Sequence, residues 1–271
     1  MSRFALLLLN TFIIFTVSCI VSAVTIWFYY HRKTGFELAA RNLKEYRYFI
    51  RPFVNEEGQM ISCELILREF DHRSKRWIAP YNIKHFPLDR LIIAVEDVQA
   101  LIPGDANSIS INMTLSQCLD YQADYFFKWI TGLLDNQKLN IELDANEILN
   151  ASAFKQARLK NILAKIRAAG ILVTIKNVDS NAGTYEQLTQ FSDMVEHYCL
   201  STHRFNLKKA KLVKKWLKVS RRNKKILGLT GIDSPEIDQL ANDFNIKMRQ
   251  GLYYSNAVPV RSMSQERVAK V

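Results

Sequence analysis

Five polar residues near the ends of short apolar runs are the residues of this chain that could do chemistry together. Glu64 begins the run Glu-Leu-Ile-Leu-Arg, which ends at Arg68. Asn112 follows Ser-Ile, and Glu142 follows Leu-Asn-Ile. Arg51 lies in the preceding run, and arginines near the mouth of a barrel can hold a phosphate through paired hydrogen bonds. Because α/β barrels carry their chemistry at the carboxyl ends of the strands, these five residues are the first candidates for a site.

The sequence carries none of the common motifs for nucleotide binding or nucleophilic catalysis. It has no GxxxxGK[ST] and no GxGxxG, and its histidines form no arrangement with an aspartate that would activate a nucleophile. The four cysteines are isolated, with no CxxC and no histidine at metal-ligand spacing: Cys19, Cys63, Cys118 and Cys199. We therefore expect no disulfide, no metal site built on cysteine and no cofactor.

Short apolar runs alternate with helical patterns over most of the chain, which is typical of an α/β barrel. The predicted strands are residues 48–54, 61–67, 108–113, 139–143, 171–175, 194–200, 226–229 and 246–249. The predicted helices are residues 89–101, 115–134, 151–169, 185–191, 207–219 and 234–244. Residues 55–60 are too few for a parallel crossover, so strand one or two should run antiparallel. The expected fold is a modified TIM-type (β/α)8 barrel with one antiparallel strand, preceded by a single transmembrane helix.

The N-terminal segment predicts that membrane helix. Residues 4–30 contain no charged side chain and are long enough to cross a hydrocarbon core of about 30 Å. Trp27, Tyr29 and Tyr30 stand where an interfacial aromatic belt is expected. The alternative is a cleaved signal peptide with Val21-Ser22-Ala23 as its cleavage site, but the apolar stretch continues beyond that cut.

The flanking charges predict the orientation of the chain. Basic residues follow the apolar segment closely, whereas Arg3 and the terminal amine alone precede it, so the soluble part should be cytoplasmic and the anchor should lie in the inner membrane. We expect a transmembrane anchor over residues 1–30, a helical stalk over 31–46, one barrel domain over 47–260 and a flexible tail over 261–271.

From about residue 48 to 259 the chain resembles the EAL family of cyclic-di-GMP phosphodiesterases, which is named for a Glu-Ala-Leu motif on its second strand. The matching pieces follow in the family's order: Arg51-Pro52 in place of Gln-Pro, Glu64-Leu65-Ile66-Leu67-Arg68, Ser110-Ile111-Asn112, Ile141-Glu142-Leu143, Gly170 and Gln250-Gly251. The resemblance implies phosphodiester cleavage with two divalent cations held by oxygen ligands from several strands. By position, Glu64, Asn112 and Glu142 would be three of those ligands, and Arg51, Arg68 and Gln250 would contact a dinucleotide.

Other positions depart from the family pattern. The fifth strand should end in Asp-Asp, and here it ends in Lys176 and Asn177. Cys199, Ser201 and Thr230 stand where the family has a lysine and two acidic residues. A protonated lysine cannot ligate a metal ion, so we expect neither bound metal nor hydrolysis.

These departures leave open what the remaining carboxylates do. One hypothesis is that Lys176 pairs with Glu64 and Glu142 and relieves their repulsion. The alternative is that the two glutamates are polar remnants satisfied by other neighbours. The functional expectation is a catalytically inactive, membrane-anchored EAL-like scaffold or regulator that binds a protein partner. The alternatives are a cyclic-di-GMP receptor that does not hydrolyse and, third, an active phosphodiesterase with ligands from unexpected positions.

A strongly basic segment carries nearly all of the net charge of +11. Residues 208–225 contain ten basic residues and no acidic residue, among them Lys208, Lys211, Lys214, Lys215, Lys218, Arg221 and Arg222. The apolar spacing between them predicts an amphipathic basic helix on the outside of the barrel. It could be a solvated face, bind anionic lipid, or bind an acidic protein. We expect no nucleic-acid partner, because no helix-turn-helix or RNA-binding signature accompanies the charge. A homodimer is a further candidate assembly.

Overall fold

The structure, a computed structural model, describes residues 3–40, 46–80, 86–99, 102, 104, 106–134, 137–204 and 210–259. The chain divides between Glu45 and Tyr46 into two compact units, an N-terminal helix and a barrel. Each unit is described by itself. The predicted tail over residues 261–271 and Lys208 of the predicted basic helix lie outside the described residues.

The N-terminal unit is the single helix α1 (Arg3–Ala40). Its segment Leu8–Trp27 has a mean hydropathy of 2.1 and none of it is buried, so it is long and apolar enough to cross a membrane, a test that a signal sequence also passes. The hydroxyl of Thr16 donates to the carbonyl of Phe12 at 2.8 Å, so this polar group is satisfied within the helix. α1 continues well past the apolar segment into the predicted stalk.

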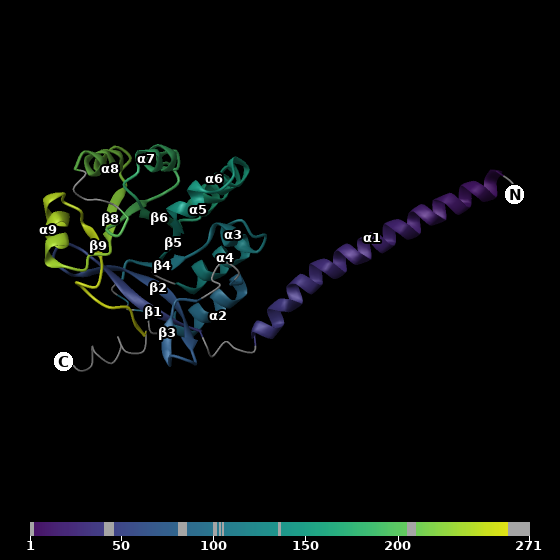
Figure 1. Cartoon of the computed structure of the whole chain (residues 1–271), viewed down its shortest axis with the longest axis horizontal. Helices are drawn as coiled ribbons and strands as arrows, with labels where there is room; N and C mark the ends of the chain where they lie inside the picture. Colours follow the sequence, from purple (N-terminus) through teal and green to yellow (C-terminus); the bar gives the residue numbers. More distant parts are fainter. Residues whose placement is uncertain are drawn as a thin grey trace. The chain divides into compact units, whose positions relative to one another are not determined.

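Eight strands close the second unit into a barrel, as predicted (Figure 1). They are β1 (Tyr46–Val54), β2 (Met60–Asp71), β4 (Ser108–Asn112), β5 (Lys138–Asp144), β6 (Leu172–Val178), β7 (His197–Ser201), β8 (Ile226–Thr230) and β9 (Met248–Gln250). The neighbouring pairs from β2 through β4, β5, β6, β7 and β8 to β9 are all parallel. β1 is antiparallel to both β2 and β9 and closes the ring. This is a TIM-type barrel with one antiparallel strand.

The β1–β2 hairpin explains that exception. Its connection turns within a few residues, where the Asn55 side chain accepts hydrogen bonds from the backbone of Glu57 and Gln59 and Gly58 takes a positive φ of 75°. The hairpin pairs Arg51 directly with Glu64. The antiparallel strand β1 therefore places Arg51 opposite Glu64, the first candidate carboxylate.

Helices cover the outside of the barrel, and their bounds differ in places from the sequence prediction. They are α2 (Leu88–Gln99), α3 (Leu115–Cys118), α4 (Ala123–Leu133), α5 (Ala145–Leu149), α6 (Ala153–Ala168), α7 (Ala182–Thr189), α8 (Ala210–Arg222) and α9 (Pro235–Asp243). The single helix predicted over 115–134 is wrong: Thr114 and Gln117 form a capping box that starts α3, which ends after one turn, and α4 begins separately.

Three short elements were not predicted. α5 starts directly at the end of β5, where the Asp144 side chain caps the backbone of Asn146. β3 (Arg76–Ile78) pairs with β2, and β10 (Val258–Pro259) pairs with β1, so both extend the sheet outside the ring. All three elements have five residues or fewer, which is too short for a periodic apolar pattern.

Candidate functional site

Neighbouring strands bring the predicted ligand positions together at one end of the barrel. Glu64 on β2 lies level with Ser110 on β4, and Asn112 two residues further on lies level with Glu142 on β5. Lys176 stands near the end of β6, the next strand along. Because these strands are parallel, their carboxyl ends meet at the same rim, and the side chains converge there.

The ammonium group of Lys176 is the centre of this group. Its Nζ lies 3.2 Å from Oε1 of Glu64 and 3.5 Å from Oε2 of Glu142, and it donates to Oδ1 of Asn112. Asn112 in turn donates to Oε1 of Glu64 at 2.7 Å, and Gln250 donates to Oε2 of Glu64 at 3.0 Å. We call these five residues the Lys176 cluster. The predicted pairing of Lys176 with both carboxylates is confirmed.

Burial and charge act differently on the three ionisable groups of the Lys176 cluster. Burial favours the neutral form of Glu64, but the ammonium of Lys176, the hydrogen bond from Asn112 and the guanidinium of Arg51 outweigh it and hold the pKa of Glu64 below its ordinary value. Burial and the negative charge of Glu64 raise the pKa of Glu142 to about 7. Burial alone would lower the pKa of Lys176, yet its two carboxylate neighbours raise it. Lys176 is therefore a permanent cation at neutral pH, while Glu142 is near its titration midpoint.

The other positions predicted to depart from the family pattern do not gather around the Lys176 cluster as ligands. Asn177 has a positive φ of 58°, and its side chain donates to Asp144 at 2.7 Å. Cys199 is buried, and burial raises the pKa of its thiol well above the usual range. Ser201 lies level with Thr230 on the next strand, and Thr230 donates to a backbone carbonyl at 3.3 Å. Asn177 thus forms a hydrogen bond with a carboxylate. Among the described residues, Cys199, Ser201 and Thr230 do not.

Two arginines lie beside the Lys176 cluster without joining it. Arg51 is half-buried, and its Nε is buried with no hydrogen-bond partner. Burial and the nearby charge of Arg51 lower the pKa of Arg68. Neither arginine side chain forms a hydrogen bond or an ion pair with another described residue, whereas Gln250 is held by Glu64. Of the three predicted dinucleotide contacts, the two arginines have no hydrogen-bond partner among the described residues, with Nε of Arg51 buried, whereas Gln250 donates to Glu64.

The donor set does not fit a pair of divalent cations. No group of three or more histidine, cysteine, aspartate or glutamate side chains within the described ranges could hold a metal ion. At the rim, the ammonium of Lys176 offsets one of the two negative charges that would attract a dication.

A second cluster of polar side chains lies inside the barrel, and it was not predicted from the sequence. Asn140 donates to the hydroxyl of Ser110 at 2.7 Å, Thr174 donates to Oδ1 of Asn140 at 3.0 Å, and the Thr174 hydroxyl lies 3.0 Å from Nδ1 of His197. Burial lowers the pKa of His197 to about 4, so the ring is neutral at physiological pH. The sequence shows a polar residue within each of four neighbouring strands, but it does not show that these residues meet, because that depends on the register between the strands.

The predicted basic helix is α8, on the outer side of the barrel next to α7 (Figure 1). The six basic side chains of α8 are exposed: Lys211, Lys214, Lys215, Lys218, Arg221 and Arg222. They are remote in sequence from the Lys176 cluster and are not among its contacts.

Comparison with known proteins identifies the fold. No protein-family model matches the sequence, and no curated protein sequence matches it. Among solved structures, the EAL enzyme Bd1971 with cAMP and cyclic-di-GMP bound is similar over 86% of this chain and 67% of that chain, with a TM-score of 0.66 and 15% identity.

Two further structures are similar to the same degree. The PaMucR phosphodiesterase in complex with c-di-GMP has a TM-score of 0.65 and 14% identity, over 83% of this chain and 96% of that chain. The Bacillus subtilis YkuI protein, which has an EAL domain and is in complex with substrate c-di-GMP and calcium, has a TM-score of 0.63 and 14% identity, over 81% of this chain and 56% of that chain. At these identities the likeness defines an EAL-like barrel and leaves the activity to the residues of the site.

Proposed function

We propose that this protein is a catalytically inactive EAL-like domain on a membrane anchor, which acts as a protein-binding scaffold or regulator in bacterial cyclic-di-GMP-related signalling. The observation that carries the proposal is the ammonium of Lys176, within 3.5 Å of both rim carboxylates. In the family pattern this position is an aspartate that binds metal. A cation fixed in the chain there opposes the binding of the dications that the family's hydrolysis needs.

The state of the other rim residues supports a scaffold over a sensor. Gln250 and Asn112 are both used in hydrogen bonds to Glu64, so they are not available to a ligand without breaking those bonds. The site that would receive a dinucleotide is therefore partly closed by its own contacts. Binding energy would have to replace these hydrogen bonds before it produced any affinity.

The test is a calorimetric titration of the full chain in detergent with cyclic-di-GMP, with and without Mg²⁺ or Ca²⁺, together with a chromatographic assay for the linear dinucleotide product. We expect neither heat nor product. Turnover in either metal would contradict the proposal outright.

The first alternative, a non-hydrolysing cyclic-di-GMP receptor, is favoured by Arg51 and Arg68, whose guanidinium groups form no hydrogen bond or ion pair with another described residue. Arginine side chains can bind phosphate oxygens bidentately. Binding without turnover in the same titration would support this alternative. In that case Arg51→Gln and Arg68→Gln should abolish the heat, whereas the exposed control Arg73→Gln should not. The third alternative, an active phosphodiesterase, needs metal ligands from positions other than those of the family.

The anchor is the second half of the proposal. We place the apolar segment of α1 across the inner membrane with the barrel on the cytoplasmic side, because basic residues follow that segment. A cleaved signal sequence is the alternative. Mass spectrometry of the protein purified from membranes decides between them, since a cleaved chain would lack residues before about position 23.

A further inference from the structure

We propose that the outer face of α8 docks on the anionic surface of the bilayer in which α1 is anchored. This inference rests on the membrane anchor of the proposed function and goes beyond it, because it gives the barrel a fixed face toward the lipid. The proposed binding partner of this face is a lipid surface that carries negatively charged headgroups.

The spacing of the basic residues on α8 produces one continuous stripe. Relative to Lys211 they stand at i+3, i+4, i+7, i+10 and i+11, which all fall on the same side of a helix. The opposite side is anchored in the barrel: Val213 and Trp216 are fully buried, and the indole of Trp216 packs on the rings of Tyr185 and Tyr198 at 5.1 and 4.9 Å. The orientation of α8 is thereby fixed, and its basic side faces outward.

No basic side chain of the stripe forms an ion pair with an acidic residue in the described part of the chain. Lys215 lies 5.6 Å from the ring centre of Tyr185 in a cation–π contact. The five other basic side chains form no ion pair or hydrogen bond with another described residue. Like charges three and four residues apart repel one another along a helix. A surface that carries this repulsion without internal compensation is complementary to an anionic partner.

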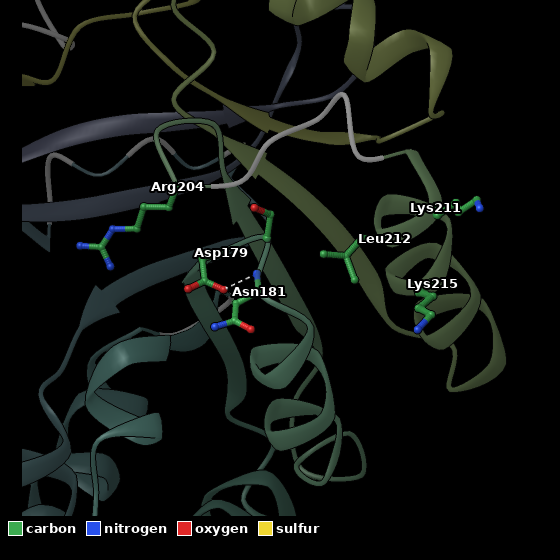
Figure 2. A pocket seen from close by; sticks show the side chains of 7 residues that line it. Asp179, Asn181, Arg204, Lys211, Leu212 and Lys215 are labelled. Atoms are coloured by element: carbon green, nitrogen blue, oxygen red, sulfur yellow. Dashed lines mark hydrogen bonds between the residues drawn. The ribbon is translucent and has the colours of Figure 1, made fainter.

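Two hollows beside α8 extend the complementarity. The first is lined by Arg204, Lys211 and Lys215, with Leu212 on its wall and Asp179 as its acidic residue. Figure 2 shows Leu212 pointing from α8 toward Asp179 and Asn181, which form the opposite wall.

The second hollow lies on the other side of the helix. It is lined by basic side chains of α8, with Leu217 and Phe244 as its apolar residues and Asp243 as its acidic residue. A basic rim around an apolar wall suits a phospholipid headgroup and the glycerol below it.

The anchor supplies the reason to choose lipid over another anion. Residues 28–45 connect the apolar segment to the barrel. Residues 28–40 continue α1 and span about 20 Å at about 1.5 Å per residue, and the five residues that follow can add at most about 18 Å, so the reach is about 40 Å. A tether of this length raises the effective concentration of the barrel at the bilayer, so even weak contacts of α8 with lipid are populated. α1 does not raise the effective concentration of an acidic protein or a nucleic acid in this way.

The experiment is amine-reactive footprinting of the full chain in nanodiscs of phosphatidylcholine, alone or with about one third phosphatidylglycerol. Mass spectrometry reports the modification rates of Lys211, Lys214, Lys215 and Lys218. The internal controls are exposed lysines elsewhere on the barrel: Lys75, Lys128 and Lys138. We expect the α8 lysines to react about fivefold more slowly in the anionic discs, and to recover at about 1 M salt, where the Debye length falls to about 3 Å.

A matched pair of variants tests the stripe itself. Lys211→Gln/Lys214→Gln/Lys218→Gln should remove the protection of Lys215 in anionic discs. Three changes at the control lysines should leave that protection intact. Equal rates in the two kinds of disc, with the chain inserted in both, would overturn the docking proposal and leave α8 as a solvated face or a site for a protein or a nucleic acid. If the chain inserts into neither kind of disc, the membrane anchor is refuted, and the docking proposal, which rests on it, is refuted as well.

Discussion

The variant Lys176→Met keeps most of the apolar stem of Lys176 and removes the ammonium between two buried carboxylates. At an effective dielectric constant of about 20, a unit charge 3.2 or 3.5 Å from a carboxylate gains about 5 kcal/mol of Coulomb energy. Desolvation of the buried charges offsets much of this gain, and removal of one partner of a buried pair typically costs about 3–5 kcal/mol. The Lys176 side chain is 23% exposed, so we take the lower figure, about 3 kcal/mol.

For a domain of this size that loss corresponds to a fall in Tm of roughly 10 °C near pH 8. The fall should shrink toward pH 5. Glu142 has a raised pKa of about 7, so it takes up a proton as the pH falls through that value, and less negative charge then needs the ammonium. Lys176 itself stays charged over the whole interval, because its pKa is raised. Thermal melts of the full chain in detergent at both pH values measure the effect, with the exposed Lys165→Met as the control. Equal Tm values for parent and variant at pH 8, or a shift that does not depend on pH, would refute the compensation.

The remaining predictions concern the same rim and one tight backbone contact. Glu142→Gln should raise the Tm at pH 8 and be near neutral at pH 5, because a carboxyl with a raised pKa lowers stability once it ionises; a loss at pH 8 would contradict this. Lys176→Asp/Asn177→Asp should gain a Tm rise of a few degrees at a Ca²⁺ concentration about tenfold above its Kd, whereas Ca²⁺ or a chelator should leave the parent unchanged in the same melts. Gly251→Ala should cost about 3 kcal/mol in denaturant unfolding, because its Cβ would overlap the backbone of Ile232, which cannot move aside like a side chain.

The barrel could be predicted from the sequence because its strands are buried on both faces. β6 begins with Leu-Val-Thr-Ile, of which the last three residues are buried, and short runs rich in apolar and β-branched residues indicate strands of this kind. The antiparallel β1 followed from the length of the turn at residues 55–60 alone. β3 and β10 have three and two residues, so they depend on pairing with longer strands and leave no pattern of their own.

Part of the candidate site could also be predicted from the sequence, and part could not. Lys176 could be identified because the order of the strand ends aligned it with an acidic position, and its charge then implied carboxylate partners. The Ser110–Asn140–Thr174–His197 chain could not be identified, because each link depends on the register between two strands. Register is a property of the closed sheet, and a single strand does not reveal it. The same holds for the use of Gln250 by Glu64, which lie 186 residues apart.

On the proposed function, the residues at the rim differ from the family pattern chiefly in their total charge. With Glu142 near its midpoint at neutral pH, the charges of Glu64, Glu142 and Lys176 sum to between −1 and 0. Such a site has little net attraction for a dication, and it needs none to be stable. Two additional carboxylates at positions 176 and 177 would make the rim strongly negative, and it would then require bound cations to offset the repulsion. On the proposed function, the covalently attached ammonium of Lys176 offsets the charge of the rim carboxylates without a bound metal ion, so the barrel keeps its stability while metal-dependent hydrolysis is lost.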